Sequence, residues 1–244
     1  MKTNINGKTV LITGAGSGIG KAIALRLAEE KANIVLLGGR TESKLRSVRK
    51  ELTAKGANAI YVCGDLTDNT VREKGIAKAL DTFGGIDILI NNAGSAMNAP
   101  FDEVSEEQYD EIMTLDVKVP YFLTQKVLPY LKKSDHATVI NIASVVGHLG
   151  YPLQSAYAAA KHALIGFTKS MANELYKDGV RVHVISPGGV LTDMVKLTRP
   201  DLAGEKMIVP EDIAETVAFL LLNRTNAVID EIMLHRVGKA PFGV

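Results

Sequence analysis

Short runs of β-branched and other apolar residues alternate along the whole chain with longer segments of helical period. The candidate strands are residues 9–13, 33–37, 59–63, 86–90, 137–142, 180–185 and 227–234, and the candidate helices are residues 18–31, 42–55, 68–83, 106–132, 155–176 and 210–222. Strands that are apolar on both faces and alternate with helices are typical of a covered parallel sheet, because every parallel connection needs a crossover. The sequence therefore predicts an α/β fold, a doubly wound parallel sheet of about seven strands with helices on both faces.

The bulk composition restricts the class of protein further. No linker or composition break interrupts the alternation, so we expect one domain over residues 1–244. The 28 basic and 27 acidic residues are scattered, which argues against a nucleic-acid or membrane partner. The five histidines show no metal-ligand spacing, so we expect no metal site. A lone cysteine and an N-terminus without a signal-peptide pattern lead us to expect a cytoplasmic protein.

A glycine-rich loop follows the first candidate strand and opens the first candidate helix. After Thr13 it contains Gly14, Gly16, Ser17, Gly18, Ile19 and Gly20. Glycines let the backbone turn sharply and approach a pyrophosphate, and a helix N-terminus offers free N–H donors. The spacing G-x-x-x-G-x-G differs from the strict G-x-G-x-x-G fingerprint, and a plain strand-to-helix turn is the alternative. Four glycines in seven residues favour the dinucleotide-binding loop of a Rossmann fold.

The end of the second strand bears on which dinucleotide binds. Gly39 and Arg40 stand where an acidic residue commonly contacts the ribose 2′-hydroxyl of NAD. Arginine accommodates the 2′-phosphate instead, so the sequence favours NADP, with NAD possible. A solvated arginine in the first turn of a helix is the alternative explanation.

A tyrosine and a lysine lie four residues apart in one candidate helix. Tyr157 and Lys161 therefore share a helix face. A nearby ammonium favours the phenolate and lowers the pKa of the tyrosine toward neutrality, which suits a general acid or base. Alone the pair is a weak signal, since most such pairs are accidents on protein surfaces. Ser144, at the end of the fifth strand and 13 residues before Tyr157, makes the arrangement specific.

Taken in order, these motifs resemble the short-chain dehydrogenase/reductase family, in its standard-length branch, and in particular its 3-oxoacyl-thioester reductases. The resemblance spans nearly the whole chain. It rests on the T-G-x-x-x-G-x-G loop from Thr13 to Gly20, Asp65, Asn91 to Gly94, Ser144, Tyr157, Lys161, Pro187, Gly188, Val190 and Thr192. Several motifs in one order at family spacings argue against a chance match.

The resemblance implies a division of labour among these residues. Tyr157 would exchange a proton with the substrate oxygen, and Ser144 would hydrogen-bond that oxygen. Lys161 would hold the nicotinamide ribose and depress the pKa of the tyrosine. Further cofactor contacts would come from Asp65 and Leu66 at the adenine, Asn92, Ala93 and Gly94 at the adenine ribose, and Pro187, Gly188, Val190 and Thr192 at the carboxamide. Asn91 has an alternative role, which is to tie neighbouring strands together.

Asp116 departs from the family pattern and is kept as a candidate catalytic residue. It stands where the family usually has an asparagine, whose backbone carbonyl holds a water linked to the lysine. Either the main chain of Asp116 serves the same role, or its carboxylate pairs with Lys161 and weakens the effect of that lysine on Tyr157. We favour the first alternative, since a main-chain acceptor tolerates a change of side chain.

The substrate side is less constrained by the sequence. We expect His148, Tyr151 and Gln154, which lie between Ser144 and Tyr157 in the sequence, to face the pocket together with those two residues. His148 is interpreted as a wall residue rather than an acid or base, because Tyr157 already fills that role. Residues 192–210 correspond to the lid of relatives. Their apolar and basic side chains suit an acyl chain with an anionic carrier, but a solvated lid explains them equally well.

The predicted function is hydride transfer between NADP(H) and a carbonyl or secondary alcohol, with a 3-oxoacyl thioester or other β-keto compound as the best single substrate class. Two alternatives stay open: an NAD-linked sugar or polyol dehydrogenase, and a non-catalytic nucleotide-binding sensor or scaffold. Small residues between Ala156 and Ala163 allow close approach of helices, and in the family this helix joins a subunit contact. We therefore expect a homodimer or homotetramer.

Overall fold

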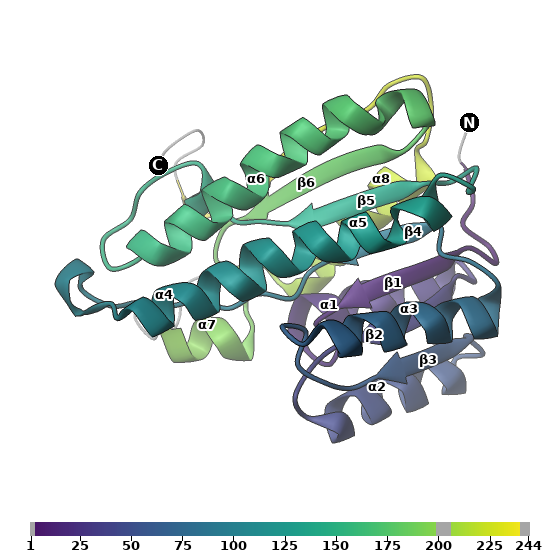
Figure 1. Ribbon diagram of the computed structural model, residues 1–244, viewed down its shortest axis with the longest axis horizontal. Coiled ribbons are helices and arrows are strands. Elements are labelled where there is room, and N and C mark those ends of the chain that lie inside the picture. The colour runs from purple at the N-terminus through teal and green to yellow at the C-terminus, as the bar shows by residue number, and fades with distance from the viewer. Residues whose placement is uncertain (1–2, 199–205, 240–244) are drawn as a thin grey trace.

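The computed structural model describes residues 3–198 and 206–239 and contains one sheet of seven strands (Figure 1). The strand order is β3-β2-β1-β4-β5-β6-β7, and every neighbouring pair is parallel. The strands are β1 (Thr9–Thr13), β2 (Asn33–Leu37), β3 (Ala59–Val62), β4 (Ile88–Asn91), β5 (Thr138–Ile142), β6 (Arg181–Pro187) and β7 (Glu231–Leu234). The doubly wound parallel sheet expected from the sequence is confirmed.

Helices cover both faces of the sheet. They are α1 (Gly18–Glu29), α2 (Glu42–Ala54), α3 (Asn69–Phe83), α4 (Glu106–Met113), α5 (Val119–Leu131), α6 (Ser155–Leu175), α7 (Asp193–Thr198) and α8 (Pro210–Leu222), with short helical turns η1 (Phe101–Glu103), η2 (Thr114–Lys118), η3 (Val145–Gly147) and η4 (Tyr176–Asp178). Val10 and Ile12 pack in one core with α1, α2 and α8, whereas Leu11 between them packs in a second core with α3 and α5. Successive side chains of a strand point to opposite faces, so both faces must be apolar.

The segment expected to be one helix over residues 106–132 is divided by a π-helical turn. α4 runs into η2, and η2 runs into α5 without leaving helical geometry. Pro120 contributes to the break because it has no N–H, so the carbonyl of Asp116 lacks the donor that a regular α-helix would provide. Single π-turns inside helices are frequent at functional sites, and this one carries Asp116.

The last strand is shorter than its apolar sequence suggested. β7 begins at Glu231, whereas the expected strand began four residues earlier. Side chains of β6 account for the difference: the guanidinium of Arg181 donates to the carbonyls of Thr225 and Ala227, and the ring of His183 contacts the carbonyl of Ile229. These carbonyls are therefore bound to side chains instead of continuing the ladder.

The strand order reverses between β1 and β4, and the crevice that binds ligands in such sheets lies beyond the carboxyl ends of the strands at that point. The loops that follow β1, β4, β5 and β6 carry the candidate site residues. Among the described residues, no helix combines the length and apolar character needed to cross a membrane, and no group of three or more potential metal ligands comes together.

Candidate active site

The glycine loop after β1 lies directly against the loop after β4. The Thr13 hydroxyl accepts the N–H groups of Asn92 and Ala93, both at 3.0 Å, and the Asn92 amide donates to the Thr13 carbonyl at 2.9 Å. A Cβ at Gly14, whose φ is +67°, would lie 2.9 Å from the Cα of Ala93. A Cβ at Gly20 would lie 2.5 Å from the Gly14 carbonyl oxygen. These two glycines are therefore required by the packing of the loop.

The start of α1 fits a diphosphate group. Ser17 is the N-cap residue, and its side chain makes no capping hydrogen bond. The first N–H groups of a helix have no partner within the helix, and together with the helix dipole they attract an anion. At Gly16, the nearest atom to an added Cβ lies 3.5 Å away, so this part of the loop is more open. The residues present thus match the phosphates of a dinucleotide.

The loop after β2 places a charge pair at its tip. Arg40 lies with its guanidinium 3.3 Å from a carboxylate oxygen of Asp65, and 83% of its side chain is exposed. Hydrogen bonds from the backbone N–H and hydroxyl of Thr67, together with Arg40, lower the pKa of Asp65. Leu66 is buried against Gly38, where an added Cβ would lie 2.5 Å from its side chain. Arg40 can thus turn toward a ligand without breaking a buried contact.

The loop after β6 approaches the glycine loop from the other side. A Cβ added at Gly18 would lie 3.2 Å from Cγ2 of Thr192, and the N–H of Gly188 donates to the carbonyl of Leu234 at 2.8 Å. Val190 is buried and bridges to Ile208. The structure therefore brings this loop close to the start of α1. The lid expected over residues 192–210 is described only in part, since residues 199–205 lie outside the described ranges.

Ser144, Tyr157 and Lys161 meet beyond the end of β5. Ser144 is buried and hydrogen-bonded to Tyr157, and Lys161 Nζ lies 5.6 Å from the centroid of the Tyr157 ring. Burial raises the pKa of Tyr157 and is the largest influence on it; Lys161 and Ser144 act in the opposite direction, and Asp116 adds to the rise. The pKa of Tyr157 therefore lies above its ordinary value, and the neutrality expected from Lys161 alone is not reached.

Asp116 pairs directly with Lys161. Its Oδ2 lies 3.1 Å from Lys161 Nζ, and the two side chains are 0% and 5% exposed. The carboxylate therefore takes part in the site, contrary to the favoured expectation that it stays apart, while a role for the main-chain carbonyl of Asp116 stays a prediction. The reason is packing, since η2 contacts α6 and an unpaired buried charge would be very costly. Ser95, which the sequence did not single out, donates its N–H to Oδ1 at 2.7 Å.

The residues expected on the substrate side make contacts of their own. His148 Nε2 lies 2.8 Å from a carboxylate oxygen of Glu231 and 3.1 Å from the Ser186 hydroxyl, so its ring is turned toward β6 and β7. Gln154 is buried and donates to Asn98 at 2.8 Å, while its buried carbonyl oxygen has no hydrogen-bond partner among the described residues. Asn91 ties neighbouring elements together, since its side-chain amide donates to Asn141 on β5 and to Thr124 on α5.

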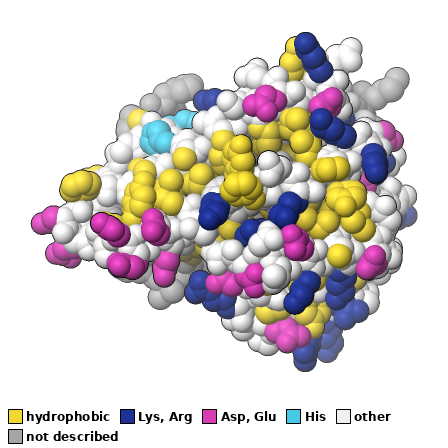
Figure 2. Space-filling model, viewed as in Figure 1, with side chains coloured by type: hydrophobic (Ala, Val, Ile, Leu, Met, Phe, Trp, Pro, Cys, Tyr) yellow, Lys and Arg dark blue, Asp and Glu magenta, His cyan; other side chains and the backbone are white. Residues whose placement is uncertain are grey.

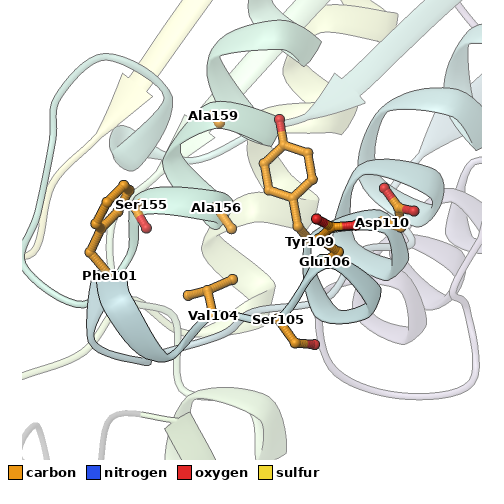
Figure 3. A pocket seen from close by; sticks show the side chains of 9 residues that line it. All are labelled: Phe101, Val104, Ser105, Glu106, Tyr109, Asp110, Ser155, Ala156 and Ala159. Atoms are coloured by element: carbon orange, nitrogen blue, oxygen red, sulfur yellow. The ribbon is translucent and has the colours of Figure 1, made fainter.

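A groove of about 520 Å³ lies beside these residues, between α4 and α6 (Figure 3). Phe101, Val104 and Tyr109 line one side, and Ala156 and Ala159 line the other. Tyr109 reaches from α4 toward Ala159, and Phe101 lies beside Ser155 (Figure 3). On α6 the groove is lined by Ser155, Ala156 and Ala159, and the partly exposed Tyr157 lies between Ala156 and Ala159 in the sequence.

A glycine loop at the reversal of strand order, followed by a buried serine, a partly exposed tyrosine and a buried lysine, defines an oxidoreductase that uses a nicotinamide dinucleotide. The short chain dehydrogenase family model matches residues 8–203. The chain therefore belongs to the short-chain dehydrogenase/reductase family, as the sequence motifs suggested, and it is an NAD(P)-dependent enzyme that acts on CH–OH groups.

Individual relatives cover most of the chain. A 3-oxoacyl-(acyl-carrier-protein) reductase of Thermotoga maritima is 33% identical over 238 residues, which are 94% of this chain and 96% of the relative. A D-beta-hydroxybutyrate dehydrogenase of Rhizobium meliloti is 37% identical over 211 residues, 86% of this chain and 82% of the relative. A solved structure from Beutenbergia cavernae, described as a candidate NAD(P)-dependent gluconate 5-dehydrogenase with bound NADP, superposes with a TM-score of 0.85 at 29% identity and covers 95% of this chain and 96% of its own.

Proposed function

We propose that this enzyme transfers hydride between NADP(H) and a β-keto compound, with a 3-oxoacyl thioester as the substrate class. The observation that carries the proposal is the convergence of Ser144, Tyr157 and Lys161 beside a glycine loop that fits a diphosphate. Two relatives, a 3-oxoacyl-(acyl-carrier-protein) reductase and a D-beta-hydroxybutyrate dehydrogenase, are named for acyl compounds with an oxygen function at the third carbon. Their names support the same substrate chemistry here.

In the reductive direction the bound cofactor supplies the hydride, and the chain supplies orientation and a proton. The Ser144 hydroxyl donates a hydrogen bond to the substrate carbonyl oxygen, where negative charge develops. The Tyr157 phenol gives its proton to that oxygen, a contribution typically worth 10²- to 10⁴-fold in rate. The Lys161 ammonium orients the ribose of the cofactor through an N–H donor, and Gly14 to Gly20 receive the diphosphate.

We assign the 2′-phosphate of NADP to Arg40. The guanidinium is exposed at the tip of the loop after β2, next to the start of α2. Lys44 stands in the first turn of α2, where its Cβ would lie 3.5 Å from a Cβ added at Gly16, and its exposed side chain can bring a second positive charge to the same ligand. NADP in the related gluconate 5-dehydrogenase structure supports this choice. The carboxylate of Asp65 would repel a 2′-phosphate, but Arg40 already pairs with this carboxylate.

Replacing Arg40 by alanine is expected to raise the Kd for NADPH by about tenfold and to leave the Kd for NADH within about twofold, because only NADPH carries the phosphate. The matched control is Arg46→Ala, which removes an exposed arginine of α2 that pairs with Glu42. Fluorescence titration of both cofactors measures the effect. Equal weakening of NADPH and NADH would contradict the assignment of the 2′-phosphate to Arg40, and tighter binding of NADH than of NADPH by wild type would support the NAD-linked alternative.

We also propose that the enzyme acts as a homodimer or homotetramer built on the outer face of α4, α5 and α6. Hydrophobic side chains form a band across this face (Figure 2), and the exposed ones include Phe101, Tyr109, Tyr121 and Phe122. Exposed apolar patches of this kind mark association surfaces. Size-exclusion chromatography with light scattering should give two or four times the chain mass, and Tyr121→Glu should shift the protein toward monomer. A wild-type monomer at micromolar concentration would contradict the assignment.

The substrate class is tested by following NADPH oxidation with a panel of carbonyl compounds. Acetoacetyl thioesters are expected to give the highest kcat/KM, followed by β-keto esters, with simple ketones, quinones and sugars well below. A sugar as the best substrate, with NAD as the better cofactor, would support the polyol dehydrogenase alternative. Tight NADPH binding without turnover of any compound would support the sensor or scaffold alternative.

A cytoplasmic location is proposed from the lone cysteine, which suits a reducing compartment.

A further inference from the structure

The carboxylate of Asp116 is held at the centre of three elements. One oxygen, Oδ2, lies 3.1 Å from Lys161 Nζ on α6, and the other, Oδ1, accepts the N–H of Ser95 at 2.7 Å and its hydroxyl at 3.3 Å. Gly94 leaves room for this contact, because an added Cβ would lie 3.1 Å from Oδ2 and 3.3 Å from Lys161 Nζ. The position of the carboxylate is therefore fixed by the loop after β4, by η2 and by α6 together.

Most of the hydrogen-bond donors of the Lys161 ammonium are directed at other groups of the protein. An ammonium has three N–H donors. One is directed at Asp116, and a second lies 3.4 Å from the carbonyl oxygen of Ile142. Within residues 3–198 and 206–239 these two groups are the hydrogen-bond partners of the ammonium, which leaves one donor for the ribose of the cofactor. The ammonium thus serves an internal carboxylate as well as the ligand, and its charge is partly balanced before any ligand binds.

Three groups act on the phenol of Tyr157. Lys161 belongs to its own helix, Asp116 to η2, and Ser144 to the loop after β5. The helix α4 also packs against α6 and carries Glu106 and Asp110 at the groove, but neither acid is among the groups that act on the phenol. Lys161 and Ser144 favour the phenolate, whereas Asp116 opposes it. An ammonium paired with a carboxylate acts as a dipole rather than as a single charge, so its attraction for a phenolate is reduced.

We propose that Asp116 is a positioning residue that keeps Tyr157 in its protonated form by partly neutralising Lys161, and so biases the enzyme toward carbonyl reduction. The inference rests on the proposed function, because it concerns the proton that Tyr157 exchanges. Lys161 itself stays charged: burial lowers its pKa, but Asp116 and Tyr157 raise it, and the net effect is a rise. Asp116 therefore acts on the tyrosine through a permanent ammonium.

The direction of the pH effect follows from the two protonation states. Carbonyl reduction needs the phenol, so it is active below the pKa of Tyr157, whereas alcohol oxidation needs the phenolate and is active above it. Burial and the Asp116 carboxylate raise this pKa. Reduction therefore extends to higher pH, and oxidation is confined to alkaline pH. Removing the carboxylate should shift both limits to lower pH.

The test is the pH dependence of both reaction directions in Asp116→Asn, with NADPH and acetoacetyl thioester for reduction and NADP with the 3-hydroxy product for oxidation. At pH values below the point where the wild-type oxidation rate levels off, the variant is expected to oxidise the 3-hydroxy compound about tenfold faster. This is the effect expected for removal of one nearby like charge. The rate of carbonyl reduction, which declines as pH rises, should begin to decline at a lower pH in the variant than in the wild type. The matched control is Glu111→Gln, an exposed carboxylate of the adjoining helix α4, which should leave both profiles in place.

A readout without turnover separates this inference from the proposed function. Tyrosinate absorption is titrated in wild type and in Asp116→Asn, each against its Tyr157→Phe counterpart, so that the difference reports Tyr157 alone. A shift to lower pH in Asp116→Asn supports the inference even if no substrate of the panel is turned over. Unshifted titration and rate profiles in a folded Asp116→Asn protein overturn it. Asp116→Ser provides a second neutral variant if the first does not fold.

Discussion

Replacing Tyr157 by phenylalanine is expected to lower kcat for carbonyl reduction by about 10³-fold and to leave the Kd for NADPH within about threefold. The substitution removes one hydroxyl from a residue that keeps some exposure and hydrogen-bonds Ser144. That hydroxyl is the proton donor in the proposed reaction, and general acid catalysis typically contributes 10²- to 10⁴-fold. The phosphate-binding loop is untouched, so cofactor affinity should persist.

Tyr151 provides the matched control for this prediction, since it is another partly exposed tyrosine six residues before Tyr157. Tyr151→Phe should retain kcat within a few-fold. Steady-state rates with NADPH and acetoacetyl thioester, together with fluorescence titration of NADPH, measure both effects. If Tyr157→Phe kept more than a tenth of the wild-type kcat, another group would have to be the proton donor.

Replacing Lys161 by methionine is expected to lower the free energy of unfolding by about 3–5 kcal/mol, because Asp116 would remain as a buried carboxylate without its cation. Methionine keeps most of the apolar length of the lysine stem, so the change isolates the charge. For a chain of this size the melting temperature should fall by about 10 °C. Catalysis should also fall, since Lys161 orients the cofactor ribose in the proposed reaction.

Combining Lys161→Met with Asp116→Asn shows whether the unpaired carboxylate causes the loss of stability. Adding Asp116→Asn to Lys161→Met removes the uncompensated charge, so at least half of the lost stability should return, while activity should not. Thermal and urea unfolding of the four proteins form a double-mutant cycle with a large coupling energy. Additive losses, with no recovery in the double variant, would show that the ion pair does not contribute in this way.

The fold follows from features that can be read along the chain. Thr9 to Thr13 is apolar on both faces and is followed by a glycine loop and a helix, and such local alternation allows few topologies other than a covered parallel sheet. The seven parallel strands and the family were therefore predictable. The start of β7 was not, because Arg181 and His183 on the neighbouring strand bind the carbonyls of the preceding segment, and this depends on tertiary contacts.

The sequence predicted which residues form the candidate site better than it predicted which of them contact one another. Ser144, Tyr157 and Lys161 follow from spacing, but the pairing of Asp116 with Lys161 depends on how η2 packs against α6. Pro120 was an available signal for the irregular turn, since a proline four residues after Asp116 removes the donor for its carbonyl. The contact of His148 with Glu231 joins residues 83 positions apart in the sequence, and no local pattern indicates it.

A single-turnover reaction with NADPH deuterated at the transferable position shows whether the enzyme delivers hydride and a proton to a carbonyl. With acetoacetyl thioester, wild type should form the 3-hydroxy product with one deuterium at the carbinol carbon for each NADPH consumed, and Tyr157→Phe should do so about 10³-fold more slowly. Tight binding of NADPH with no deuterium transferred to this or any other carbonyl compound would exclude the proposed reaction.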